Sequence, residues 1–195
     1  MAAADRTKQA LAQALKELMQ AQPLEKISVG DITAHAQMGR STFYYHFKDK
    51  YDLVNWIFES ECGSLMKVPA NAQEMEEGML TLQAYIRENL TFYRNALEYS
   101  GQNSLQDYIY EMLESRFAQR IRQEEESRKL GMQEDEVRFA AAFFASALQG
   151  LLVRGVRSGR AGDSVRYTEC VRRLFKGRML ESYMDTAWQE KPAEK

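Results

Sequence analysis

Cysteine, proline and glycine are scarce in this chain, which has 2 cysteines, 3 prolines and 11 glycines among 195 residues. Two cysteines, Cys62 and Cys170, are too few for a disulfide scaffold, so the sequence favours the reducing cytoplasm over secretion. We expect both thiols to be buried and unreactive. Because few residues break helices and alanine, leucine, glutamate and glutamine are plentiful, the composition predicts an all-α fold.

Long hydrophobic runs and metal-ligand clusters are missing as well. The most apolar run, 139–153, is shorter than the roughly 20 residues that a membrane span needs, so we expect no membrane contact. The first residues carry no apolar leader segment. The 2 histidines, His35 and His46, show no zinc-site spacing with cysteine or aspartate. No catalytic triad or glycine-rich cofactor loop is found, so we expect neither an enzyme nor a bound cofactor or metal.

The net charge of −2, from 26 lysines and arginines against 28 acids, does not by itself indicate nucleic-acid binding. Charge is distributed unevenly, however. Between His35 and Lys50 there are Arg40, Lys48, Lys50 and two histidines against Asp49 alone. Because phosphate contact requires only a local basic patch, DNA remains a candidate partner.

Apolar residues recur at helical spacing along most of the chain. The pattern predicts helices over 6–20, 28–36, 40–47 and 50–65, with Ser28 and Asp49 as N-caps and a turn at 37–39. A loop at 69–73 follows. Beyond it we expect one or two helices within 75–97, then helices over 104–129, 133–158 and 163–175, and a further turn or two after Gly177.

The helix predicted over 40–47 has two different faces. On a wheel of about 100° per residue, Phe43 and Phe47 share one side and should pack inward. The other side is polar and aromatic, which suits the major groove of DNA. We expect base contacts from Arg40, Ser41, Tyr44 and Tyr45, phosphate contacts from Thr42, His46 and Lys50, and further contributions from Lys48 and the backbone at Ser28. Simple packing is the competing interpretation, but it gives no reason for exposing Tyr-Tyr-His.

These residues resemble the TetR family of one-component regulators. The resemblance rests on Ile27-Ser28, on Asp31-Ile-Thr-Ala34 and on Ser41-Thr-Phe-Tyr-Tyr-His-Phe-Lys-Asp-Lys-Tyr-Asp-Leu53. It implies a DNA-binding head over 1–50 with three helices and a helical body over 51–195 that binds an effector and dimerises. Such a dimer would bind a near-palindromic double-stranded operator, usually as a repressor. The alternative is a helical co-regulator that works through a partner protein.

The chain departs from the family pattern at three positions. Gln37 stands where the family often has glycine in the turn, and Gly39 where it has a serine cap. Gly30 stands where some members have a base-reading arginine, so helix 28–36 should read no base. The segments 86–97 and 101–105 also resemble, more loosely, bodies of the dihydroxyacetone-kinase-operon regulator type.

The body offers candidates for an effector pocket and for a dimer interface. A pocket for a small apolar or aromatic effector would be lined by Trp56, Tyr85, Phe92, Tyr93, Tyr108, Met112, Phe143 and Phe144. Large apolar residues at helical spacing are usually core residues, so the core is the competing assignment for each of them. A homodimer interface would use Phe139, Phe143, Ala147, Gly150, Leu151, Tyr167, Val171 and Leu174, although the interior of the body is the competing assignment for each of them.

Overall fold

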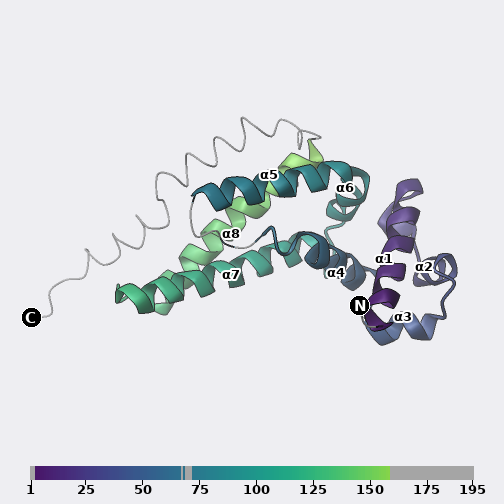
Figure 1. The fold of residues 1–195 in the computed structure, drawn as a ribbon, viewed down its shortest axis with the longest axis horizontal. Coiled ribbons are helices and arrows are strands. Elements are labelled where there is room, and N and C mark those ends of the chain that lie inside the picture. Colours follow the sequence, from purple (N-terminus) through teal and green to yellow (C-terminus); the bar gives the residue numbers. More distant parts are fainter. Residues whose placement is uncertain (1–2, 67, 69–71, 159–195) are drawn as a thin grey trace, which may run out of the picture. The chain divides into compact units, whose positions relative to one another are not determined.

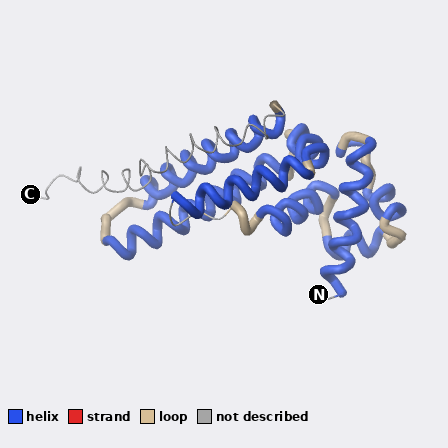
Figure 2. The backbone as a smooth tube through the Cα atoms, turned by 45° about the horizontal axis from the view of Figure 1, so that its top comes forward, coloured by secondary structure: helices blue, strands red, loops and turns tan. Residues whose placement is uncertain are grey.

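The computed structural model describes residues 3–66, 68 and 72–158. In that part of the chain all regular structure is helical and no strand occurs, as Figures 1 and 2 show, so the predicted all-α class is confirmed. The helices are α1 (Ala3–Ala21), the short 3₁₀ helix η1 (Leu24–Lys26), α2 (Val29–His35), α3 (Arg40–His46), α4 (Lys50–Cys62), α5 (Ala72–Glu88), α6 (Leu90–Glu98), α7 (Leu105–Arg128) and α8 (Glu134–Arg157).

Local capping chemistry determines where the first helices begin. Ser28 and Asp31 form a reciprocal capping box at the start of α2, and the Asp49 carboxylate accepts the backbone N–H groups of Tyr51 and Asp52, each at 2.8 Å, at the start of α4. Both predicted caps are confirmed. The turn between α2 and α3 contains Gln37 at φ 54°, a left-handed conformation that glycine adopts without strain and other residues adopt at a cost.

Similar signals divide the second half of the chain. The backbone breaks at Asn89, so the apolar pattern over 75–97 corresponds to two helices, α5 and α6. The hydroxyl of Ser104 accepts the backbone N–H of Asp107 and thereby caps α7, as predicted. Gln133 and Glu136 form a second capping box before α8. The helix predicted over 163–175 and the segment after Gly177 lie outside the described residues.

The chain forms two compact units that do not follow a division at residue 50. The first contains residues up to Ser64 together with Ile86–Tyr108, and the second contains Leu65–Tyr85 and the chain from Ile109 onward. The first unit therefore includes α4 and α6 besides the helices predicted for the DNA-binding head. The division of functions between 1–50 and 51–195 stays a prediction.

Polar side chains on and after α6 explain why it belongs to the first unit. The Asn95 amide donates to the carbonyls of Met19 and Gln22 at 3.3 and 2.9 Å and accepts the backbone N–H of Leu24 at 2.7 Å. One amide thus satisfies backbone groups that the end of α1 leaves open. After α6, the ring of Tyr99 stacks on Tyr51 with centroids 4.1 Å apart.

The second unit contains α8 and α7 from Ile109 onward, and these two helices pack on each other. The rings of Phe117 and Phe144 stack at 5.4 Å, and the Arg122 guanidinium donates to Glu134 at 2.6 Å. The guanidinium lowers the pKa of Glu134, mainly by this hydrogen bond. α8 and α7 are therefore joined by an aromatic contact along their length and an ion pair near the turn between them.

α8 corrects one expectation from the sequence. The helix has 24 residues and a mean hydropathy of 1.5 in its best 18-residue window, so by length and composition it is long enough to cross a membrane. The apolar run 139–153 underestimates the length of this segment, because the helix continues at both ends into charged residues. Core helices of water-soluble proteins pass the same test, so this finding assigns no membrane.

Candidate nucleic-acid interface

α3 is fixed to the first unit by two phenylalanines. Phe43 is 0% exposed and Phe47 is 3% exposed, and Phe47 meets the Trp56 ring of α4 at 5.8 Å. The predicted inward side of α3 is therefore confirmed. Since α3 has 7 residues, these two side chains hold both its middle and its end, and they determine which side chains face outward.

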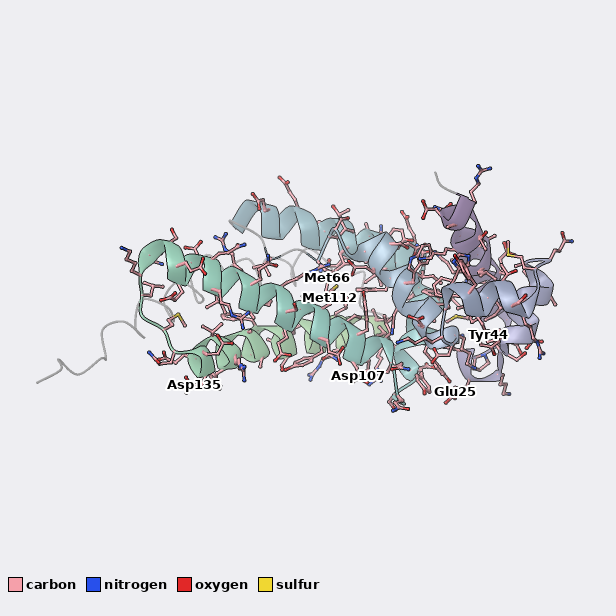
Figure 3. The ribbon with its side chains drawn as sticks, turned by 90° about the horizontal axis from the view of Figure 1, so that it is seen from below. Glu25, Tyr44, Met66, Asp107, Met112 and Asp135 are labelled. Carbon is pink, nitrogen blue, oxygen red and sulfur yellow. The ribbon has the colours of Figure 1, made fainter. Side chains whose placement is uncertain are left out.

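The outward side of α3 is aromatic and polar. Tyr44 is 58% exposed and Tyr45 is 83% exposed, and Ser41 is exposed as well. Figure 3 labels Tyr44 on this helix. Thr42 and His46 are half-buried at its sides, and the His46 ring meets Tyr45 edge-on at 4.9 Å. Because the rings of Tyr44 and Tyr45 are exposed, their burial does not stabilise the fold, and both rings are available to a partner.

Arg40 and Lys48 are the cations that this side offers. Both are exposed. In the part of the chain that the structure describes, neither side chain forms a hydrogen bond or an ion pair, although the backbone N–H of Lys48 donates to Asp52 at 3.0 Å. We name the exposed residues Arg40, Ser41, Tyr44 and Tyr45 the recognition face.

Lys50 has a different role from the predicted phosphate contact. Its ammonium donates to the carbonyls of Leu24, Glu25 and Ile27 at 2.7, 2.9 and 2.7 Å. These bonds use all three of its hydrogens, so the side chain ties the start of α4 to the segment around η1. Burial lowers the pKa of Lys50, against the attraction of nearby acids that include Glu25. The sequence shows only that Lys50 lies in a basic stretch. It cannot show that the ammonium donates all its hydrogens to backbone carbonyls.

Ser28 is likewise occupied within the protein. Its hydroxyl donates to the Asp31 carboxylate at 2.7 Å and its backbone N–H donates to the same carboxylate at 2.8 Å. These bonds lower the pKa of Asp31. Because the donors of Ser28 are engaged and a carboxylate lies beside them, the predicted phosphate contact at Ser28 is not supported by the geometry.

The eight predicted pocket residues are divided between the two units. Trp56, Phe92, Tyr93 and Tyr108 lie in the first unit, whereas Tyr85, Met112, Phe143 and Phe144 lie in the second. Phe92 and Tyr93 are almost fully buried, and Phe144 is 6% exposed against Phe117. These three are core residues, the competing interpretation given above.

A cleft of about 440 Å³ lies between α1 and α4 in the first unit. Of the predicted pocket residues it includes Trp56 alone. An ion pair of 2.9 Å between Lys16 and Glu61 belongs to its lining. The cleft is lined by Asp5, Gln9, Ala12, Gln13, Lys16, Trp56, Ser60 and Glu61.

The thiol of Cys62 is buried, as predicted, and lies 3.4 Å from the Tyr93 hydroxyl. Burial raises its pKa to about 11, so the thiol stays protonated and unreactive near neutral pH. Cys170 lies outside the described residues. In the described part of the chain, no three histidine, cysteine or acidic side chains come together in an arrangement that could hold a metal ion.

The predicted interface residues on α8 lie on one side of the helix. Phe139 is 65% exposed, Phe143 is 50% exposed and Ala147 is exposed, while Gly150 and Leu151 are half-buried. We name these five residues the α8 face. Phe143 therefore does not line an enclosed pocket. The remaining predicted interface residues, Tyr167, Val171 and Leu174, lie outside the described part of the chain.

Comparison with known proteins agrees with this arrangement. Residues 7–57 match the model of bacterial regulatory proteins of the tetR family, and residues 73–177 match a C-terminal region model of transcriptional regulators, TetR_C_8. The chain is 35% identical over 88 residues to the HTH-type dhaKLM operon transcriptional activator DhaS of Lactococcus lactis. That similarity covers 45% of this chain and 47% of the relative, so it spans about half of either protein.

A solved structure of a dihydroxyacetone kinase operon activator DhaS has the same fold. It covers 86% of this chain and 97% of its own, with a TM-score of 0.56 and 23% identity. Since the two family models together match most of the chain, its function is transcription regulation through DNA binding and not catalysis. The chain belongs to the tetR family of bacterial regulatory proteins.

Proposed function

We propose that the recognition face enters the major groove of a near-palindromic operator and reads base edges there. The exposed side of α3, held from behind by Phe43 and Phe47, is the observation that carries this proposal. An arginine with free donors suits a guanine edge, and a serine hydroxyl can donate or accept. The rings of Tyr44 and Tyr45 can contact thymine methyl groups or phosphates.

Phosphate contacts complete the proposed interface. Thr42 and His46 lie beside the recognition face, and Lys48 follows it with an exposed side chain. Contacts of this kind supply affinity and orientation, and the recognition face supplies sequence preference. Lys50 and Ser28 are left out of the proposed set because their donors are engaged within the protein.

We further propose that the regulator is a homodimer that uses the α8 face. Exposed Phe139 and Phe143 supply apolar area, and Ala147 and Gly150 let a second helix approach closely. A two-fold axis would place two recognition faces on half-sites about 34–36 Å apart or a multiple of that spacing. Since the operator is in genomic DNA, this proposal places the protein in the cytoplasm.

A small apolar or aromatic effector would shift the dimer between states that fit the operator and states that do not. Repression relieved by that effector is the first candidate for the sign of regulation. Activation is the second, because the relative DhaS is named an activator. A reporter gene placed behind the operator distinguishes them: expression rises on deletion of a repressor and falls on deletion of an activator.

DNA binding by the isolated protein is the direct test. An operator is first selected from a pool of random duplexes, and affinity is then measured by fluorescence anisotropy. We expect Arg40→Ala and Tyr44→Ala each to weaken binding about tenfold and to reduce sequence preference. If both variants bind as tightly and as selectively as the parent, α3 is not the recognition helix. If the parent selects no sequence, the proposed operator recognition is wrong, and the co-regulator alternative is supported.

A further inference from the structure

The Arg40 guanidinium occupies the space where residue 30 would carry its side chain. A Cβ atom built on Gly30 would lie 2.5 Å from Nη2, 3.3 Å from Cζ and 3.4 Å from Nε of Arg40. The first of these distances is far too short for any real contact. Arg40 therefore lies across the first turn of α2, and it can do so because residue 30 is glycine.

Nothing else in the described structure holds the guanidinium by a directed bond. Asp31 attracts it, because the Arg40 charge contributes to the lowered pKa of Asp31 after the larger effect of the hydrogen bonds from Ser28. No hydrogen bond or ion pair joins Arg40 to any residue of the described ranges. The position of the guanidinium thus depends on the open space at Gly30 and on a weak attraction.

We propose that Gly30 is a positioning residue that determines from where Arg40 contacts the operator. This inference rests on the proposed contact between Arg40 and DNA. Because residue 30 is glycine, the five N–H donors of Arg40 lie at the junction of α2 and α3 before the operator binds. Any larger residue at position 30 displaces the guanidinium towards another rotamer. A displaced guanidinium would approach the operator from another position, so we expect its contact with the base edge to weaken.

Alanine at position 30 separates this effect from damage to the fold. Gly30 lies in a helix, and no left-handed φ is found there. The atoms that the new Cβ meets belong to the far end of a flexible side chain. Because alanine forms helices better than glycine, the thermal midpoint of Gly30→Ala should equal or exceed that of the parent. A loss of DNA affinity in a variant at least as stable would then come from Arg40.

The experiment is a double-mutant cycle on the selected operator and on duplexes with single base-pair changes. We expect Gly30→Ala to weaken operator binding about fivefold and to flatten the preference at the base pairs where Arg40→Ala also flattens it. In the Arg40→Ala background, Gly30→Ala should change affinity by less than about twofold. Gly78→Ala in α5, where a Cβ would lie in ordinary contact with the Leu65 carbonyl oxygen at 3.4 Å, is the matched control and should bind like the parent.

Three other results would contradict either the positioning role of Gly30 or the proposed contact between Arg40 and DNA. If Arg40→Ala weakens binding and Gly30→Ala does not, the positioning role is wrong and the proposed contact stands. If Gly30→Ala weakens binding equally with and without Arg40, glycine acts by another route and the positioning role is wrong. If Arg40→Ala itself binds like the parent, the proposed contact fails first, and the inference fails with it.

Discussion

α3 and α8 each carry two consecutive aromatic residues, of which one ring is buried and the other is exposed. Phe43 and Tyr44 meet edge-on at 5.5 Å and 82°, and Phe143 and Phe144 meet at 5.5 Å and 86°. The geometry is nearly the same, but the exposed ring is a tyrosine on α3 and a phenylalanine on α8. A hydroxyl suits a hydrated partner with polar edges, and a bare ring suits an apolar one. This difference supports the proposals that α3 contacts DNA and that α8 contacts a protein surface.

The largest expected effect is on stability and concerns the buried ring. Phe43→Ala should lower the free energy of unfolding of the first unit by about 3–5 kcal/mol, because it removes a fully buried phenylalanine. Tyr44→Ala, one residue away and exposed, should change it by less than about 0.5 kcal/mol. Urea unfolding followed by circular dichroism measures both. Equal losses for the two variants would mean that Tyr44 also packs, and the comparison of faces would fail.

The second prediction concerns assembly through the α8 face. Phe139→Glu combined with Phe143→Glu should yield folded monomers and reduce operator affinity about 100-fold or more, because two linked heads bind far better than one. Analytical ultracentrifugation and anisotropy measure the two results. Leu80→Glu, which also replaces an exposed apolar residue of the second unit, is the control and should leave both unchanged. A dimer that survives the double substitution would rule out this face.

A smaller effect separates the hydroxyl from the ring. Tyr45→Phe keeps the exposed ring of the recognition face and should weaken operator binding about two- to fivefold through the lost hydrogen bond. Tyr110→Phe removes a hydroxyl from the second unit, outside the recognition face and the α8 face, and should leave operator affinity unchanged. Titration by fluorescence anisotropy is accurate enough for this difference. Unchanged affinity of Tyr45→Phe would limit the role of residue 45 to ring contact.

The smallest predicted effect is a change of stability with pH. It concerns Tyr51, whose ring stacks on Tyr99 and does not face outward. Burial raises the pKa of Tyr51 to about 12 from 10.0, with a further contribution from Tyr99. The protonated form is favoured in the folded state. Its contribution to stability is therefore complete below about pH 10 and is lost as the pH rises through about 12.

Tyr51→Phe keeps the stacked rings and removes the titrating group. Urea midpoints measured from about pH 9 to about pH 12 should fall less steeply for this variant than for the parent. Tyr45→Phe, which removes an exposed tyrosine from the first unit, is the control. Parallel curves for parent and Tyr51→Phe would show that other groups cause the alkaline loss.

The sequence predicts those features that depend on neighbours along the chain. Ser28 and Asp49 are recognisable caps because each acts within three residues of itself. Phe43 and Phe47 are recognisable as buried because a helix repeats its faces over four residues. The fold class and the composition of the recognition face follow from such local patterns.

Contacts between distant segments could not be predicted in this way. Asn95 reaches backbone groups 71 to 76 residues away, and nothing in the neighbouring sequence distinguishes it from a polar residue on the solvent-facing side of a helix. Whether a lysine ammonium meets solvent or three backbone carbonyls depends equally on folding, which is why the sequence alone predicts a phosphate contact for Lys50. The rings of Phe92 and Tyr93 carried no signal that separates core from pocket, since both environments select large apolar groups.

The three carbonyls around Lys50 also affect how the protein should respond to salt. Binding to DNA releases about 0.9 counterions for each phosphate that a cation neutralises, and this number sets the slope of affinity against salt concentration. An ammonium that donates only to carbonyls displaces no counterion. On the proposal that Lys50 contacts no phosphate, each DNA-binding head should release one counterion fewer than its basic stretch suggests, so its affinity should tolerate salt better and depend more on the bases it reads.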